Sequence, residues 1–212
     1  FKGGVSAIDL LISEHHHRAA PGGSGGVKAI GNYAPGMKPS KEAKAKGYAE
    51  VMYLDAETHT CIEEVGAANF FCLNDGTLYT PELTGTILPG ITRDSIIQLA
   101  RHLGYEVVEG RVEADFALQA EEAVCCGTAA VISPIGSITH DGVKKIIGNG
   151  KPGAVTTQLY NALTGIQNET EEDICGWLHP LPESRRVRTA AASKTVASAI
   201  TTGSAGVSIS SS

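Results

Sequence analysis

GGSGGVKAIGNY, residues Gly22 to Tyr33, is the stretch from which the rest of this chain can be interpreted. Lys28 is the only charged residue in this stretch, and glycines lie on both sides of the lysine. Glycine lets the backbone approach a ligand closely, and bulky neighbours are absent, so one amine projects into a site that the loop itself shapes. The stretch therefore predicts a ligand-binding loop that carries a functional lysine.

Further along, the chain contains other residues that are typical of a site for a phosphorylated cofactor. Glu63 and Glu64 form a paired carboxylate, Gly90–Arg93 form a turn before a predicted helix, and Gly127–Ala129 form a Gly-Thr-Ala turn. Turns that open a helix bind anions through free backbone N–H groups. One lysine, one carboxylate and two anion-binding turns are what pyridoxal phosphate chemistry requires.

Length and composition bound the remaining possibilities. The 212 residues, 42% hydrophobic and 19% charged, are ordinary for one large or two small globular domains. The net charge of -6 argues against general affinity for nucleic acid or for an anionic membrane surface. No stretch approaches the roughly 20 apolar residues of a membrane span. The start, Phe-Lys-Gly-Gly, has no basic or apolar leader, so we expect no targeting segment and an N-terminally truncated protein.

Cysteine and histidine patterns favour neither a disulfide framework nor a metal site. The five cysteines form no C-x-x-C pair, so we expect reduced structural thiols; they are Cys61, Cys72, Cys125, Cys126 and Cys175. His15, His16 and His17 are consecutive, and on an extended segment they cannot all face one ion, so we expect no metal there.

Hydrophobic patterning predicts many short strands and a few helices. The predicted strands are residues 5–12, 50–55, 61–65, 70–73, 77–79 and 105–112, with further strands across 123–138. Asn74-Asp75-Gly76 is a hairpin signal. The predicted helices are residues 91–103, 115–122 and 154–166, with Thr92 as the N-cap and Gly104 as the end of the first. Residues 33–47 predict a helix whose first half is weakened by Pro35, Gly36 and Pro39.

The chain divides into unequal parts by composition. Residues 1–26 resemble the end of one domain and a connection, residues 27–180 the cofactor-binding domain, and residues 181–212 a disordered tail rich in Ala, Ser and Thr. Two nucleotide-loop interpretations fit poorly. A P-loop needs Ser or Thr after its lysine, where Ala29 stands, and a dinucleotide fingerprint needs a strand–turn–helix context that Pro35 and Pro39 disfavour.

Four segments together resemble a branched-chain amino acid aminotransferase, a fold-type IV pyridoxal phosphate enzyme. They are GGSGGVKAIGNYAP, YLDAETHTCIEEVGAANFF, TPELTGTILPGITRDSIIQLARHLGYEV and CCGTAAVISPIGSI. The order, spacing and amino-acid sequence of these segments match the family over about residues 1–178. The sequence is most similar to plant and algal plastid members. The resemblance implies an α+β fold with a pseudo-barrel of short strands flanked by helices, and a homodimer in the full-length protein.

The resemblance also assigns roles to individual residues. Lys28 corresponds to the Schiff-base lysine, which shuttles a proton between the substrate Cα and the cofactor. Glu64 corresponds to the carboxylate at the pyridine nitrogen. Glu63 points to the opposite face of a regular strand and is not expected to share that role. Tyr33 corresponds to the phenol that hydrogen-bonds the cofactor's phenolic oxygen.

Two turns hold the remaining groups under the same resemblance. Leu88, Ile91 and Thr92 line the turn that cradles the phosphate, with help from the helix dipole. Thr128 adds a hydroxyl to the phosphate, and the N–H groups of Thr128 and Ala129 bind the substrate carboxylate. Relatives carry an N-terminal domain with a phosphate-binding arginine and an aromatic wall, for which nothing in this chain substitutes.

The implied reaction is reversible transfer of an amino group between leucine, isoleucine or valine and 2-oxoglutarate. Two alternatives stay open: a D-amino-acid aminotransferase or aminodeoxychorismate lyase of the same fold, and a non-catalytic fragment. The implied partners are small amino and 2-oxo acids, with no nucleic acid or membrane. The implied location is a plastid or mitochondrion.

Overall fold

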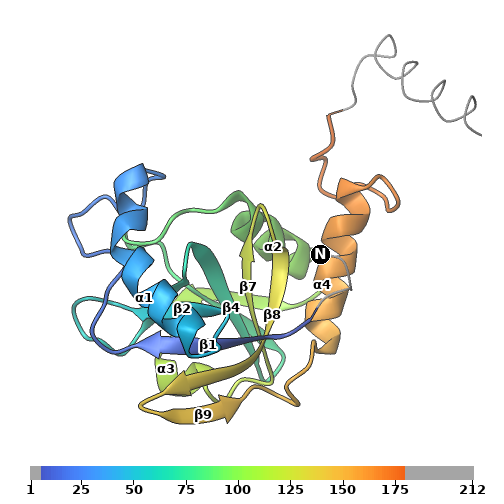
Figure 1. Cartoon of the computed structure of the whole chain (residues 1–212). Helices are drawn as coiled ribbons and strands as arrows, with labels where there is room; N and C mark the ends of the chain where they lie inside the picture. The colour runs from blue at the N-terminus through green and yellow to red at the C-terminus, as the bar shows by residue number, and fades with distance from the viewer. Residues whose placement is uncertain (1–5, 180–212) are drawn as a thin grey trace, which may run out of the picture. The chain divides into compact units, whose positions relative to one another are not determined.

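Six β-strands close into a barrel in the computed structural model of the chain, which describes residues 6–179 (Figure 1). They are β1 (Ile8–Ser13), β2 (Glu50–Leu54), β3 (Ile62–Val65), β4 (Ala68–Asn74), β7 (Glu122–Gly127) and β8 (Val131–His140). Their order is β3-β2-β1-β8-β7-β4, and an additional pairing of β3 with β4 closes the ring. The predicted pseudo-barrel is confirmed.

Three more strands extend the sheet from the ring. β5 (Thr77–Pro81) pairs with β4, β6 (Glu106–Gly110) pairs with β5, and β9 (Val143–Ile146) pairs with β8. The predicted hairpin joins β4 to β5: Asn74 lies opposite Thr77, and Asp75 and Gly76 take φ values of 48° and 73°. Both values are left-handed, as a tight hairpin turn requires. The prediction missed β9, whose four residues are all exposed and carry no buried apolar pattern.

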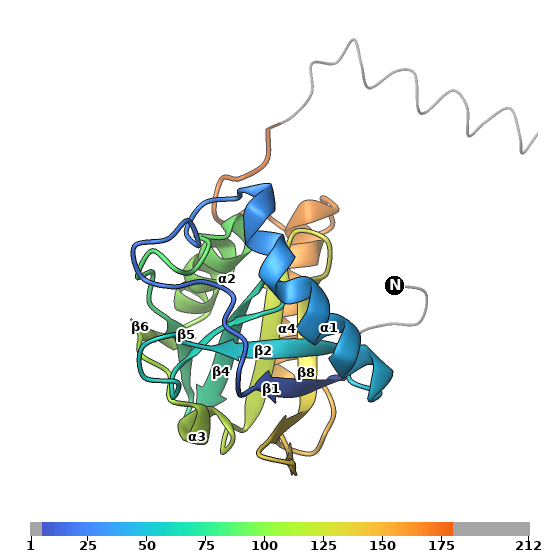
Figure 2. The same ribbon diagram turned by 60° about the vertical axis from the view of Figure 1, so that its left-hand side comes forward.

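Helix α1 (Ala34–Ala45), preceded by the 3-10 turn η1 (Ile30–Tyr33), covers β2 on the outside of the barrel (Figure 2). The doubt about its first half was wrong, because the helix begins before both prolines. Pro35 lies in the first turn, where the missing N–H has no helical partner to lose. Pro39 lies inside the helix and is buried with Ala43.

Helices α2 (Ile91–His102) and α4 (Ala154–Gln167) pack against each other, and both contact β7 (Figure 1). Gly104, with φ of 88°, follows the end of α2 as predicted. Thr92 does not cap α2, because Gly90 occupies the N-cap position and no side chain bonds there. The helix predicted at 115–122 is only α3 (Ala114–Ala117), since the chain enters β7 at Glu122 and pairs with β4.

Apolar side chains fill the barrel and the space under each helix. The main cluster includes Leu10, Ile12, Met52, Phe70, Ile135 and Ile138. A second cluster joins α1 to β2 through Ala43, Val51 and Tyr53. All these residues belong to one unit, which ends at Cys175. The predicted tail, residues 181–212, lies outside the described residues. Among the helices described, none is both long and apolar enough to cross a membrane.

The carboxylate of Glu122, at the start of β7, caps α4. Its oxygens accept the N–H groups of Val155 at 3.0 Å and of Thr156 at 2.7 Å. A Cβ at Gly153, the N-cap residue, would lie 2.0 Å from the Glu122 carboxyl carbon, so a larger residue there would displace the capping carboxylate. The negative charge of Glu122 also interacts favourably with the positive end of the helix dipole.

We therefore predict that Glu122→Ala lowers the free energy of unfolding by about 1 to 2 kcal/mol, as the loss of a helix cap does. Glu106→Ala, which removes an exposed glutamate from β6, is the matched control and should change little. Chemical denaturation of both variants measures the difference. Equal stability of the two variants would show that the cap contributes nothing.

Candidate functional site

A row of paired residues runs across four strands and sets the position of the candidate site. Tyr53 on β2 lies opposite Glu64 on β3, Glu64 lies opposite Asn69 on β4, and Asn69 lies opposite Cys126 on β7. Directly paired residues share a face of the sheet. The tertiary structure thus brings Glu64 close to the end of β7, after which Thr128 follows.

Glu64 is the charged side chain of this row, and only 1% of its surface is exposed. Its Oε1 accepts the N–H of Leu88 at 3.1 Å and the side-chain amide of Asn69 at 3.3 Å. Its Oε2 forms an ion pair with Nε of Arg18. Burial raises the pKa of Glu64 to about 7, although Arg18 and the Leu88 N–H oppose that rise. The carboxylate therefore changes charge near neutral pH.

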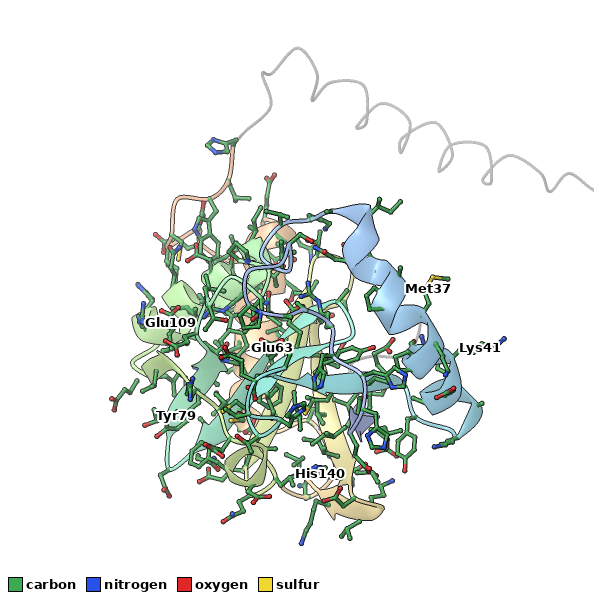
Figure 3. All side chains as sticks on the ribbon, turned by 90° about the vertical axis from the view of Figure 1, so that its left-hand side faces the viewer. Met37, Lys41, Glu63, Tyr79, Glu109 and His140 are labelled. Carbon is green, nitrogen blue, oxygen red and sulfur yellow. The ribbon has the colours of Figure 1, made fainter. Side chains whose placement is uncertain are left out.

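Glu63 is also buried, but it has a different partner. The hydroxyl of Thr86 donates a hydrogen bond to its Oε1, and burial raises the pKa of Glu63 as well. The register steps from Tyr53 opposite Glu64 to Leu54 opposite Ile62, which leaves Glu63 at a bulge. The alternation expected of a regular strand therefore does not apply here, and their partners distinguish the two carboxylates instead. Figure 3 shows Glu63 in the interior, away from the outward-pointing Met37.

The loop that carries Lys28 is held by one asparagine. Nδ2 of Asn32 donates to the carbonyls of Ser24 and Val27, both at 2.7 Å, and its Oδ1 accepts the Ser24 hydroxyl at 2.7 Å. A further bond from the Ala29 N–H to the Val27 carbonyl, at 2.9 Å, closes a tight turn around Lys28. Lys28 itself is exposed. Sequence reasoning missed Asn32, although it lies inside the decisive stretch.

Tyr33 and Arg18 line a cavity of about 260 Å³ between α1 and β2. Tyr33 is 44% exposed, so its hydroxyl is accessible. The floor includes Tyr53, whose hydroxyl is buried without a hydrogen-bond partner, and burial raises the pKa of Tyr53 to about 12. Gly66, which directly follows β3, is also part of the wall.

The start of α2 presents free backbone donors next to Glu64. Ile91 and Thr92 are the first helical residues, so their N–H groups have no partner within the helix. Asn69 ties this turn to the sheet, because its Nδ2 also donates to the Leu88 carbonyl at 2.9 Å. A Cβ at Gly90 would lie 2.2 Å from Oδ1 of Asn69, so a side chain there would displace the Asn69 amide from Leu88 and Glu64.

The Gly-Thr-Ala turn joins β7 to β8. Gly127 pairs with Val131, and both Thr128 and Ala129 are exposed between them. Val131 has a φ of 58°, which tightens the return of the chain. The structure therefore bonds Glu64 to Leu88, in the turn before α2, and places Tyr33 and Arg18 in the wall of the same cavity. Lys28, Thr128 and Ala129 stay on exposed loops and make no hydrogen bond to Glu64 in the described part of the chain.

Comparison with known proteins identifies the family of this chain. The family Amino-transferase class IV matches residues 6–138. The chain belongs to this family. It is 49% identical over 177 residues to the chloroplastic branched-chain-amino-acid aminotransferase 3 of Arabidopsis thaliana, and 43% identical over 187 residues to a probable branched-chain-amino-acid aminotransferase of Streptomyces coelicolor. These matches cover 84% and 85% of this class IV chain, but only 43% and 52% of the relatives.

Solved structures give the same family. The branched-chain amino acid aminotransferase of Escherichia coli has a TM-score of 0.75 at 38% identity, covering 83% of this chain and 56% of that one. The enzyme of Thermobaculum terrenum in its PLP form has a TM-score of 0.75 at 32% identity, covering 83% and 56%. This class IV chain therefore has the fold-type IV architecture and spans about half the length of its relatives.

Cysteine and histidine side chains do not form a second centre in residues 6–179. The five cysteines are free, and four of them are buried. The rings of His17 and His59 lie 4.6 Å apart, edge to face. No group of three or more His, Cys, Asp or Glu side chains in this range is arranged to hold a metal ion.

The raised pKa of Glu64 predicts that stability falls as pH rises. Its folded pKa of about 7 exceeds the ordinary 4.5, so the folded state binds the proton more tightly than the unfolded state does. Stability from this group is fully present below pH 4.5 and is lost between there and pH 7, at about 1.4 kcal/mol per pKa unit. Glu63 acts in the same direction.

Denaturation midpoints measured from pH 4.5 to 8 test this dependence. We expect Glu64→Gln to flatten the curve, because an amide does not titrate. Glu57→Gln, at an exposed position, should leave the slope unchanged. A wild-type curve that rises through this window would contradict the burial-driven shift.

Proposed function

We propose that this chain is the cofactor-binding part of a pyridoxal phosphate-dependent branched-chain aminotransferase. It would transfer an amino group between leucine, isoleucine or valine and 2-oxoglutarate. The observation that carries the proposal is the buried Glu64 carboxylate, which hydrogen bonds link directly to the turn before α2. A buried carboxylate and a helix start with free N–H donors, joined through the same turn, suit a ligand with a basic ring nitrogen and a phosphate.

The residues present fit pyridoxal phosphate on two structural observations. The carboxylate of Glu64 can accept about four hydrogen bonds and uses three, so it can take one more from a ring N–H. The start of α2 has no side-chain cap, so the N–H groups of Ile91 and Thr92 are available to a phosphate. When bound, the cofactor supplies an electron-withdrawing ring that stabilises negative charge at the substrate Cα.

Each remaining group has a role that follows from its chemistry. The N–H groups of Ile91 and Thr92, with the Thr92 hydroxyl, bind the phosphate, and Thr128 adds a second hydroxyl. Leu88 would line the turn that holds the cofactor. Tyr33 donates a hydrogen bond to the phenolic oxygen. The Lys28 amine would take the proton from the substrate Cα and hold it for return.

The substrate and partner assignments rest on the relatives. The N–H groups of Thr128 and Ala129 would bind the substrate α-carboxylate. The complete enzyme would be located in a plastid or mitochondrion, as the chloroplastic and mitochondrial names of the Arabidopsis relatives suggest. The family resemblance alone supports a homodimer. Residues 27–180 would carry the groups that bind the cofactor, on a barrel that also includes β1 from the first 26 residues.

Covalent trapping tests the role of Lys28. Borohydride reduction of the chain mixed with pyridoxal phosphate should attach the cofactor to the peptide that contains Lys28, as peptide mass spectrometry would show. Lys28→Ala should lose this label and keep its melting temperature, since the side chain is exposed. The label on Lys38, Lys41 or Lys44 of α1 instead would refute the assignment.

Paired substitutions test which carboxylate serves the ring nitrogen. Glu64→Gln should lower the rate of leucine transamination by orders of magnitude with a modest loss of cofactor affinity, because an amide cannot keep the ring protonated. Glu63→Gln should retain most of the rate. The assay uses the 212-residue chain together with the N-terminal part of an Arabidopsis relative. Turnover of D-alanine in preference to L-leucine would favour the D-amino-acid alternative.

A further inference from the structure

Arg18 is a buried cation at the junction of three segments. Its side chain is 9% exposed and forms an ion pair with Glu64 on β3. One terminal nitrogen, Nη1, donates to the Thr86 carbonyl at 2.7 Å, and the other, Nη2, donates to the Gly25 carbonyl at 3.4 Å. A single guanidinium thus contacts the barrel, the turn before α2 and the glycine-rich loop.

The two loops that Arg18 joins are already in close contact. A Cβ at Gly25 would lie 2.3 Å from the Thr86 carbonyl oxygen, and a Cβ at Gly26 would lie 2.9 Å from the Gly85 carbonyl oxygen. Backbone approaches this close leave room only for glycine. Gly25 precedes Lys28 by three residues, and Thr86 precedes Leu88 by two. The place where Arg18 binds is therefore shared by the lysine loop and the cofactor turn.

We propose that Arg18 is the positioning residue of this site: it fixes the Glu64 carboxylate and at the same time locks the Lys28 loop against the Thr86–Leu88 segment. This inference rests on the proposed function, because it concerns the same site. It adds a coupling between the Glu64 carboxylate and the loop that carries Lys28. Movement of either loop would then disturb the partner of Glu64.

The chemistry of the guanidinium explains why arginine suits this position. Its planar fork has donors in fixed directions, so it serves the carboxylate and both carbonyls at once, whereas an ammonium is a compact point charge. The other titratable groups around Glu64 do not replace Arg18. Glu63 raises the pKa of Glu64, and the neighbouring Cys126 thiol and Tyr53 phenol are neutral because burial raises their pKa values.

The experiment compares Arg18→Gln and Arg18→Lys in the full 212-residue chain without cofactor. Carbon NMR of the Glu64 side chain follows its titration, and amide hydrogen exchange follows residues 23–28 and 85–88. Arg18→Gln should raise the pKa of Glu64 by roughly 1 to 3 units, because an opposite charge is lost. Exchange in both segments should speed up by roughly tenfold or more, as expected for the loss of charge-assisted hydrogen bonds. Arg111→Gln, at an exposed position, is the matched control.

The lysine variant separates charge from geometry. Arg18→Lys should keep the titration of Glu64 close to wild type and still show fast exchange in both segments. If Arg18→Lys keeps the wild-type protection from hydrogen exchange in residues 23–28 and 85–88, the proposal is overturned. This test does not depend on whether Arg18→Gln folds. The Glu64 titration and the hydrogen exchange are both measured without cofactor. Their outcome is therefore independent of the borohydride labelling of Lys28, and a failure of the Arg18 proposal can be told from a failure of the proposed function.

Discussion

The buried ion pair between Glu64 and Arg18 is the interaction on which the candidate site depends. A carboxylate with 1% exposure cannot remain charged in an apolar barrel wall without a close cation and N–H donors. Arg18 supplies the cation, while Leu88 and Asn69 supply the donors. Because these partners come from three different segments, the charge of one side chain holds the surrounding loops in place.

Close backbone contact is the second constraint, and glycine makes it possible. Gly25 and Gly90 each stand where a Cβ would overlap a neighbouring oxygen, of Thr86 in one case and of Asn69 in the other. The first contact fixes the loop of Lys28, and the second fixes the start of α2. The positions of both loops therefore depend on the absence of a side chain at Gly25 and Gly90 as well as on hydrogen bonds. A site built this way is preorganised before any ligand arrives.

Most of the barrel could be predicted from the sequence, because short apolar runs and turn residues mark strands locally. The Asn74–Gly76 hairpin and the Gly104 helix end are examples in which one or two residues determine the backbone. Errors occurred where distant residues compete with local preference. Pairing of β7 with β4 shortened α3, and burial of Pro39 against the barrel stabilised a helix that local propensity disfavours. The bulge at Glu63 was also hidden, because register is a property of two strands.

The sequence by itself determined the family, and it predicted the lysine loop and the role of Glu64, since those depend on residue types at short spacing. It could not identify Arg18 or Asn69 as parts of the site, because an arginine in a loop and an asparagine in a strand have no local signature of their partners. Only the tertiary structure decided that Arg18 meets Glu64 and Thr86, residues 46 and 68 positions further along the chain. The physical reason is that closing the barrel brings these segments together, and burial then selects the partners that can neutralise a charge without water.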